Sequence, residues 1–427
     1  MSKEKELKMK NKKLNVVELF SGIGSQAKAL ENININFETV NTCEWDIHAI
    51  VAYNLIHNDG SLHSGSLGLT KLELLNELNK YNLSGDCKNP INKKYLSSLP
   101  EETLRQIYSS ILNTGNLIDI KSLTGDMLPK DVDIMTYSFP CQDLSNVGAF
   151  HGYNKGIDRD ANNRSGLLWQ VERILNERIK LGLPLPKSLV LENVATLLSE
   201  RHKHNFQEWQ DILVKLGYYN KIYTLNAKDF GAAQNRKRLI MISFLTNFDQ
   251  KLNKKLDAYF SEHNLEDISY VNSLNIHKDS LKQILKVDYS NVIYLQEALE
   301  SQPNDTKSRR DIWNDNVKLI DANNQYIERD FAATLTTKQD RHPNSGNIYF
   351  DIDNGKSKFR YITPRESFML MGFDENDFDK VNNISLKGRG DSKFFTRDIL
   401  LHLAGNSIVV NVLEQIFKQI INILKLL

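Results

Sequence analysis

Apolar residues in the first 245 positions occur in short runs that alternate with amphipathic stretches. Runs rich in β-branched residues predict buried strands over 14–20, 39–43, 132–136, 188–191 and 239–242. Apolar positions at helical spacing predict helices over 26–31, 48–56 and 164–179. Strands that alternate with helices are typical of open α/β sheets, so the expected fold class is α/β with a Rossmann-like domain.

The pattern changes at two places. Residues 57–118 are polar and rich in Asn, Lys and Ser, with helical pieces over 71–83 and 101–112, and we interpret them as an insertion on the surface of the fold. Beyond 245 the α/β alternation stops, and a helix-like pattern returns only over 359–373. We therefore expect a flexible basic tail (1–13), a first domain (14–245), a smaller irregular domain (246–399) and a C-terminal helix (400–427) that returns to the first domain.

Composition narrows the class of protein. The chain has 427 residues, 41 % of them hydrophobic, and a formal net charge of +1, so any nucleic-acid surface must be a local patch. Three cysteines without C-x-x-C spacing argue against a disulfide framework or a structural zinc site, and favour a reducing cytoplasm. Polar residues interrupt the apolar segment 409–427, which predicts a core-facing helix, and we expect no metal and no membrane partner.

Two neighbouring strand ends carry residues suited to a nucleoside. A glycine turn follows the first strand, and its residues are Phe20, Ser21, Gly22, Ile23 and Gly24. Glu44 and Trp45 end the next strand, where an acid can bind ribose hydroxyls and an aromatic ring can stack on adenine. A plain strand–helix turn is the alternative. The turn lacks a third glycine and a phosphate-binding Lys, which favours a cofactor without pyrophosphate. Asp126 lies further along the chain, and it is either an ordinary turn residue or a contact for the adenine amino group.

Three further groups are candidates for chemistry. Cys141 follows Pro140 just beyond a predicted strand and is either a thiol nucleophile or a small buried residue. Glu192 stands at the end of the strand 188–191 and is a candidate acid. Arg236 and Arg238 alternate on an extended chain, so both can face one side, although a solvated basic turn fits as well. The Gly-, Asn- and Asp-rich stretch 148–163 predicts a mobile loop.

Taken in order, these motifs resemble those of the C5-cytosine DNA methyltransferase family, of the bacterial and phage restriction–modification type. The resemblance rests on the following motifs: Phe20-Ser21-Gly22-Ile23-Gly24, Glu44-Trp45-Asp46, Pro140-Cys141-Gln142, Glu192-Asn193-Val194, Gln234-Asn235-Arg236-Lys237-Arg238, Arg365-Glu366 with Met371-Gly372-Phe373, and Gly405-Asn406-Ser407. Met371 stands where the family has Gln. Parts of the chain look closest to bacterial enzymes that methylate CpG, but the stretch after Thr334-Leu335 differs from theirs, so the target sequence stays open.

The resemblance implies a DNA (cytosine-5-)-methyltransferase that uses S-adenosyl-L-methionine. It implies that Cys141 attacks C6 of a flipped-out cytosine, that Glu192 binds N3 and the exocyclic amine, and that Arg236 and Arg238 bind O2. It makes 14–245 the catalytic and cofactor-binding domain and 246–399 the target-recognition domain. Carried over by position, further cofactor residues are Pro140, Leu168 and Asn406, and DNA contacts are Gln142, Ser145, Thr334, Lys338, Gln339 and Arg341.

The expected partner is double-stranded DNA, with a separately encoded restriction endonuclease and a monomeric enzyme. Three alternative functions are each distinguishable by one feature. A tRNA cytosine-5 methyltransferase of the same family would act on tRNA and not on duplex DNA. A catalytically silent DNA-binding protein would lack the site residues, and a nicotinamide oxidoreductase would carry a third glycine in the first turn. For each DNA-reading residue, an ordinary solvated surface position is the alternative.

Overall fold

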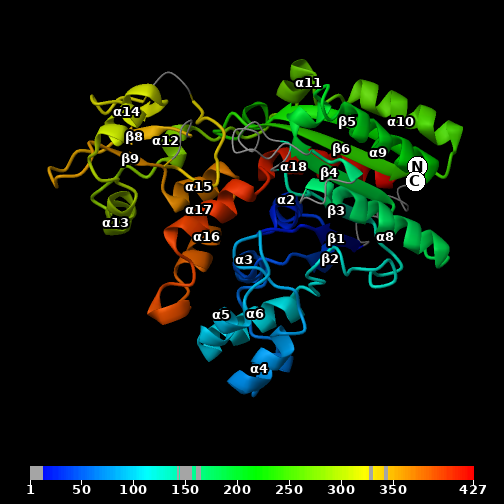
Figure 1. The fold of residues 1–427 in the computed structure, drawn as a ribbon. Helices are drawn as coiled ribbons and strands as arrows, with labels where there is room; N and C mark the ends of the chain where they lie inside the picture. Colours follow the sequence, from blue (N-terminus) through cyan, green and yellow to red (C-terminus); the bar gives the residue numbers. More distant parts are fainter. Residues whose placement is uncertain (1–12, 142–143, 145–155, 160–164, 327–329, 341–344) are drawn as a thin grey trace. The chain divides into compact units, whose positions relative to one another are not determined.

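The computed structural model describes residues 13–141, 144, 156–159, 165–326, 330–340 and 345–427 (Figure 1). Contacts divide the chain into two units. Unit 1 contains the chain through Leu225, Lys237–Ser273 and Leu413–Leu427, and unit 2 contains Asn226–Arg236 and Leu274–Val412. The chain therefore passes between the two units four times.

A six-stranded sheet forms the centre of unit 1. Its strands are β1 (Leu14–Leu19), β2 (Phe37–Cys43), β3 (Ile134–Tyr137), β4 (Ser188–Val194), β5 (Tyr218–Asn226) and β6 (Lys237–Leu245), in the order β2-β1-β3-β4-β6-β5. β2, β1, β3 and β4 are parallel neighbours, and β6 runs antiparallel to β4. This parallel-rich sheet confirms the Rossmann-like α/β fold class.

The register of the four parallel strands aligns their carboxyl ends. Leu19 of β1 lies opposite Cys43 of β2 and Tyr137 of β3, and Tyr137 lies opposite Leu191 of β4. The residues that follow these positions therefore leave the sheet along one edge. Open α/β sheets bind their ligands at this edge.

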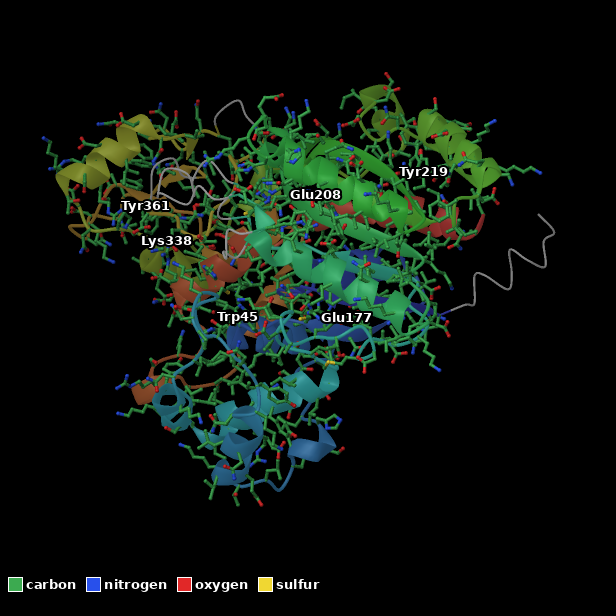
Figure 2. All side chains as sticks on the ribbon, turned by 45° about the vertical axis from the view of Figure 1, so that its right-hand side comes forward. Trp45, Glu177, Glu208, Tyr219, Lys338 and Tyr361 are labelled. Atoms are coloured by element: carbon green, nitrogen blue, oxygen red, sulfur yellow. The ribbon has the colours of Figure 1, made fainter. Side chains whose placement is uncertain are left out.

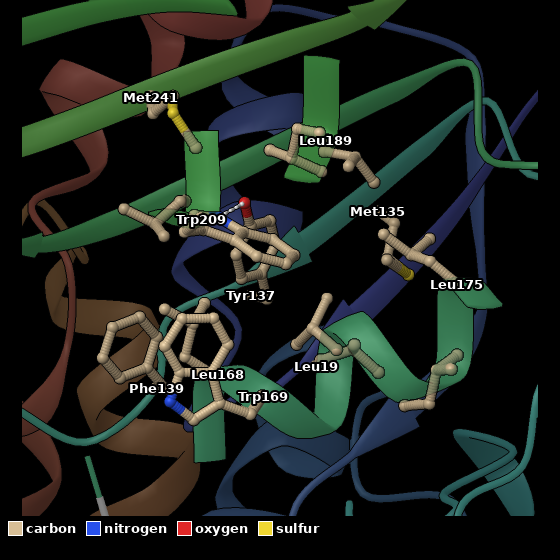
Figure 3. Close-up of a cluster of buried hydrophobic side chains, with 14 of the residues drawn as sticks. Leu19, Met135, Tyr137, Phe139, Leu168, Trp169, Leu175, Leu189, Trp209 and Met241 are labelled. Carbon is tan, nitrogen blue, oxygen red and sulfur yellow. Dashed lines mark hydrogen bonds between the residues drawn. The ribbon is translucent and has the colours of Figure 1, made fainter. Parts of the chain in front are cut away.

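Two helices, α8 (Leu168–Lys180) and α9 (Lys203–Lys215), cover one face of the sheet. Their apolar residues form a core with the strand residues that point to this face (Figure 3). The indole Nε1 of Trp209 donates to the Tyr137 hydroxyl at 3.0 Å, which satisfies both polar atoms inside that core. The predicted helix over 164–179 corresponds to the short 3-10 helix η3 (Ser165–Leu167) followed by α8, and its first residue, 164, falls outside the described part.

Helices α2 (Ser25–Asn32), α3 (Ile47–His57) and α18 (Val410–Leu424) contribute contacts on the other face. Glu18 alternates with Val17 and Leu19 along β1, and its carboxylate accepts from the Tyr53 hydroxyl of α3 at 2.9 Å. On β5, the Tyr223 hydroxyl donates to Gln419 of α18 at 3.0 Å.

The stretch 57–118 is a helical module of unit 1. It contains η1 (Ser64–Ser66), α4 (Lys71–Leu78), α5 (Lys93–Ser98) and α6 (Glu101–Asn113), and α6 packs against both α3 and α4. A capping box between Thr70 and Glu73 starts α4. The helices expected over 71–83 and 101–112 are thus present, the first of them shorter than expected.

Helices α10 (Gln250–Glu262) and α11 (Ile268–Ser273) belong to unit 1, although the sequence pattern places a boundary at 245. Phe260 of α10 stacks on Tyr219 of β5 with ring centroids 6.0 Å apart, and it also contacts Phe244 of β6. The aromatic contacts explain why this polar-looking stretch joins the sheet domain.

Unit 2 contains a second, three-stranded sheet, in the order β7-β8-β9. Its elements are α12 (Leu281–Ile284), α13 (Val292–Glu300), α14 (Lys307–Asp315), β7 (Lys318–Ile320), β8 (Asn347–Tyr349), β9 (Phe359–Tyr361), α15 (Pro364–Leu370), α16 (Glu375–Asn382), η6 (Arg389–Asp391) and α17 (Arg397–Asn406).

The expectation of one helix-like stretch over 359–373 is wrong at its start. Residues 359–361 form the strand β9, and α15 begins only at Pro364, where Thr363 and Glu366 form a capping box. The buried Arg360 guanidinium pairs with Glu366 at 2.7 Å, which fixes the strand to the helix. An apolar pattern alone does not show where the strand ends and the helix begins.

Among the residues that the structure describes, one segment, Arg397–Leu424, is long and apolar enough to cross a membrane by length and composition. Of its most apolar window, 72 % is buried inside the structure. Burial of this extent is typical of a helix in a protein core, which agrees with the expectation for the C-terminal segment.

Candidate active site

The first element of the site is the turn between β1 and α2. Phe20 leaves the strand with a φ of +58°, and its amide donates to the Cys43 carbonyl at 2.8 Å. Gly22 and Gly24 also have positive φ values, +55° and +84°. A side chain at Gly24 would overlap the rings of His57 and Tyr53, so this position requires glycine both for its φ and for space.

Glu44 lies directly against this turn. Its Oε2 accepts from the Gly22 amide at 3.1 Å, and its Oε1 accepts from the amides of Trp45 and Asp46, each at 2.9 Å. Desolvation raises the pKa of Glu44 to about 7, although the three amide donors oppose this rise. A carboxylate oxygen has two lone pairs, so Oε2 retains the capacity to accept from a ligand hydroxyl. Trp45 follows, half-buried.

Asn116 holds the backbone of Glu44 from the far end of the insertion. Its Oδ1 accepts from the Glu44 amide and its Nδ2 donates to the Glu44 carbonyl, both at 3.0 Å. Two residues further on, the Ile118 carbonyl accepts from the Cys43 thiol. The sequence pattern gave no signal for Asn116, because the two residues are 72 positions apart.

Cys141 lies beyond the carboxyl end of β3 and is half-buried. Three hydrogen bonds fix the backbone carbonyls of Cys141 and of the two residues before it. The Ser165 hydroxyl donates to the Pro140 carbonyl at 2.7 Å, Asn193 Nδ2 donates to the Phe139 carbonyl at 3.1 Å, and the Leu144 amide donates to the Cys141 carbonyl at 3.0 Å. Sequence reasoning did not single out Ser165 or assign a function to Asn193.

Glu192 and Arg238 form an ion pair next to this segment. The Arg238 Nε lies 3.2 Å from the Glu192 Oε1, with side-chain exposures of 18 % and 11 %. In the antiparallel pair β4–β6, Arg238 lies opposite Val194, which places its side chain diagonally across from Glu192. The pair therefore joins a candidate acid to a fixed positive charge.

Arg236 has different partners. It is buried in unit 2, where its Nη1 donates to the Leu335 carbonyl at 2.9 Å and its Nη2 donates to the carbonyls of Gly405 and Ser407 at 3.2 and 3.1 Å. Gln234 binds the Leu335 amide through its Oε1 at 2.8 Å. The two arginines thus have different contacts, because Arg236 precedes β6 and Arg238 lies within it. That both act on one group stays a prediction.

Asp126 does not lie beside Glu44. The amide of its neighbour Gly125 donates to Glu177, and the Gly125 carbonyl accepts from Arg178, both at 2.9 Å on the last turn of α8. Arg178 also binds the Pro129 and Lys130 carbonyls that precede β3, so Asp126 is near the amino ends of the strands. Figure 2 shows Glu177 and Trp45 apart along the strands.

Asp119 is a second carboxylate close to the end of β2, near Cys43. It follows Ile118, whose carbonyl accepts from Cys43, and its Oδ2 accepts from Asn82 at 2.7 Å. Asp119 follows the short apolar piece Leu117-Ile118, whereas Asp126 follows Gly125 in a turn, and the sequence pattern alone did not show which of them lies beside Glu44.

The remaining predicted residues occupy varied positions. Leu168 is fully buried in the core under the sheet.

In unit 2, Asn406 ends α17 and contacts His402, and Thr334 donates to the Asn235 carbonyl at 2.7 Å. Lys338 is exposed (Figure 2), whereas Gln339 is buried and accepts from Ser345 at 2.9 Å. Outside the described residues lie Gln142, Ser145, Arg341 and all of the predicted loop 148–163 except 156–159.

Within the ranges that the structure describes, no group of three or more His, Cys, Asp or Glu side chains could hold a metal ion. The site consists of a nucleoside-type turn, a thiol, and a carboxylate paired with a guanidinium. Such a set suits nucleophilic and acid–base chemistry on an organic substrate.

Comparisons with known proteins agree with this geometry. The chain is 34 % identical over 417 residues to "Orphan methyltransferase M.SssI" of Spiroplasma monobiae, covering 96 % of this chain and 98 % of that protein. It is 32 % identical over 408 residues to "Type II methyltransferase M2.ScrFI" of Lactococcus lactis subsp. cremoris, covering 95 % and 99 %. Among solved structures, the S. pombe Dnmt2 methyltransferase matches with a TM-score of 0.55 at 18 % identity, covering 97 % of this chain and 99 % of that one, which supports the fold.

The family model for C-5 cytosine-specific DNA methylases matches residues 88–422. This match spans the Cys141 segment, the Glu192–Arg238 pair and all of unit 2. The chain belongs to the C-5 cytosine-specific DNA methylase family.

Proposed function

We propose that this DNA methyltransferase transfers the methyl group of S-adenosylmethionine to C5 of a flipped-out cytosine, through a covalent bond between Cys141 and C6. The observation that carries the proposal is the common edge of the sheet. Because β1, β2, β3 and β4 end in register, Phe20, Glu44, the Cys141 segment and Glu192 all follow that edge. A methyl donor bound at β1 and β2 would thus lie beside a base bound at β3 and β4.

The residues at the first two strand ends fit an adenosine without phosphates. Glu44 would accept from the ribose hydroxyls, and Trp45 would stack on the adenine. Asp119, in place of Asp126, would accept from the adenine amino group, because it follows the segment that holds Glu44. The S-adenosylmethionine sulfonium supplies the methyl group.

Cys141 would act as the nucleophile. Its Sγ bonds to C6 of cytosine while the electron pair of the C5=C6 bond moves toward N3, which takes a proton from Glu192. C5 is then the nucleophile that receives the methyl group. A base, for which a water molecule suffices, removes the C5 proton, and the C5=C6 bond forms again as the thiolate leaves. The N3 proton then returns to Glu192, which restores the carboxyl group for the next turnover.

The ion pair gives Glu192 and Arg238 complementary roles. Once Glu192 has protonated N3, its carboxylate is stabilised by the Arg238 guanidinium 3.2 Å away. Arg238 would also bind the cytosine O2, which gains charge when C6 is attacked. Arg236 has a positioning role in this proposal, because both of its Nη groups bind carbonyls of unit 2.

Unit 2 would read the DNA. Base flipping costs about a few kcal/mol, which contacts to the duplex must offset. Lys338 and Thr334 are candidates for these contacts, with Gln142, Ser145 and Arg341 proposed from sequence. Gln339 would shape the loop, because it is buried against Ser345. The proposal also includes a separately encoded restriction endonuclease as partner and a monomeric state of the enzyme.

The first test is bisulfite sequencing of mixed-sequence duplex DNA after incubation with the protein and S-adenosylmethionine. We expect protected cytosines in one fixed sequence context. Protection that is absent from duplex DNA but present on tRNA would overturn the assigned substrate and favour the tRNA alternative.

A trapping experiment tests the covalent step. Loss of a C5 substituent must occur as a cation, and fluorine cannot leave in that form, so a duplex with 5-fluorocytosine at the target should stay bonded to the enzyme. Peptide mass spectrometry should find the adduct on Cys141. An adduct on Cys43 or Cys87, or turnover by Cys141→Ser, would contradict the mechanism.

A further inference from the structure

The insertion contains a loop, residues 82–91, that lies on the Glu44–Trp45 turn. The Ser84 amide donates to the Trp45 carbonyl at 2.7 Å, and the Ser84 carbonyl accepts from the Ile47 amide at 2.9 Å. Ser84 thus forms a parallel bridge with Asp46 at the start of α3. Figure 2 shows Trp45 between the first strands and the helices of the insertion.

Side chains add two further attachments. The Cys87 thiol hydrogen-bonds the Asp46 carboxylate, which also caps α3 by accepting from the amides of His48 and Ala49. Asn82 Nδ2 donates to the Asp119 Oδ2 at 2.7 Å. The loop therefore contacts both chain segments that flank the proposed adenine site.

The loop is also ordered by its own contacts. The Asp86 carboxylate accepts from the amides of Lys88 and Asn89, each at 2.8 Å, and from the Ser84 hydroxyl at 3.2 Å. Partial burial opposes ionisation, but these hydrogen bonds lower the pKa of Asp86 to about 2. A loop with a fixed conformation can hold its neighbours in place without an entropic cost at the moment of ligand binding.

We propose that the loop 82–91 positions the nucleoside end of the methyl donor, and that Asn82 is a positioning residue which orients the Asp119 carboxylate toward the adenine amino group. The proposal rests on the proposed function for its ligand. It assigns the insertion a part in cofactor selection, through the backbone of Trp45 and the side chain of Asp119.

The two contacts predict different effects on binding. The backbone contact to Trp45 supports stacking, which does not depend on the substituent at C6 of the purine. The Asn82 contact orients an acceptor, which favours an amino group and disfavours a carbonyl oxygen. A pair of ligands that differ only at this edge of the purine, with an amino group in one and a carbonyl oxygen beside a protonated N1 in the other, therefore separates the two contacts.

The test measures dissociation constants by calorimetry for S-adenosylhomocysteine and S-inosylhomocysteine, in which a carbonyl replaces the amino group. Asn82→Ala should weaken the adenosine ligand by about three- to tenfold and the inosine ligand much less. Asp86→Ala, which removes the internal contacts of the loop, should weaken both ligands to a similar extent. Lys80→Ala, at an exposed position two residues before Asn82, is the control and should change neither.

Equal weakening of both ligands by Asn82→Ala, or no change, would overturn the role of Asn82. Unchanged binding in Asp86→Ala would overturn the role of the loop. If the unmodified protein binds neither ligand, the proposed function fails instead, which is a distinct outcome. Thermal unfolding of each variant separates these effects from loss of folded protein.

Discussion

Replacing Arg236 and Arg238 in turn by Met tests whether two residues of one motif have different tasks. Arg236 donates to three buried carbonyls, those of Leu335, Gly405 and Ser407. Leaving each of these acceptors unpaired costs about 1 kcal/mol or more, so Arg236→Met should lower the free energy of unfolding of unit 2 by about 3 kcal/mol. For a unit of about 150 residues, this is a fall in Tm of roughly 6–12 °C.

Arg238→Met should behave in the opposite way. It removes the guanidinium 3.2 Å from Glu192, where the proposed mechanism needs a positive charge. Loss of one donor of this kind lowers kcat by about 10²–10³-fold. Because Arg238 leaves one carboxylate, which can take up a proton, whereas Arg236 leaves three buried carbonyls without a donor, the loss of Arg238 should lower the Tm by less.

The assay is steady-state methylation at a temperature well below both transitions, together with calorimetry of the same samples. The reasoning would be refuted if Arg236→Met lowered kcat 100-fold while its Tm stayed that of the unmodified protein. It would also be refuted if Arg238→Met kept its kcat. The Lys variants at both positions should recover part of each loss, since Lys keeps the charge but not the fork of donors.

Three further outcomes are expected. Gly24→Ala should weaken S-adenosylhomocysteine binding at least tenfold in calorimetry, whereas Gly22→Ala, which meets open space at a similar φ, should weaken it less. Arg178→Met should lower the free energy of unfolding in urea by about 3–5 kcal/mol, because the buried guanidinium binds five carbonyls; a loss under 1 kcal/mol would contradict this. Burial raises the pKa of Glu18 from 4.5 to about 7, so its folded state binds more protons and roughly 3 kcal/mol of stability is lost as the pH rises from about 4.5 to above 7. Glu18→Gln should remove that part of the decline between pH 5 and pH 8.5.

Local patterns predicted the sheet domain well, because strands β1, β3, β4 and β6 are mostly buried and their apolar runs are unambiguous. Strand β5 was missed because polar residues alternate along Tyr218–Asn226, and β9 because a short apolar strand next to a helix continues the same pattern. Neither error changed the fold class, which depends on the order of the longer strands.

The site was predictable where it depends on the end of a strand. The positions of Phe20, Glu44 and Glu192 follow from strands that the sequence indicates clearly. The choice of Asp119 over Asp126, and the separation of Arg236 from Arg238, depend on hydrogen bonds across about 50 to 170 residues. No local pattern carries that information.

The four passages of the chain between the units limit how the protein can be divided or recombined. A fragment cut at 245 would lack the third segment of unit 1, and a fragment that starts at 274 would lack the eleven residues Asn226–Arg236 of unit 2. Helix α18 even begins in one unit and ends in the other. An exchange of unit 2 between relatives, in evolution or in engineering, must therefore transfer Gln234 and Arg236 together with their distant carbonyl and amide partners. Otherwise the transferred unit loses the hydrogen bonds that these two residues form within it.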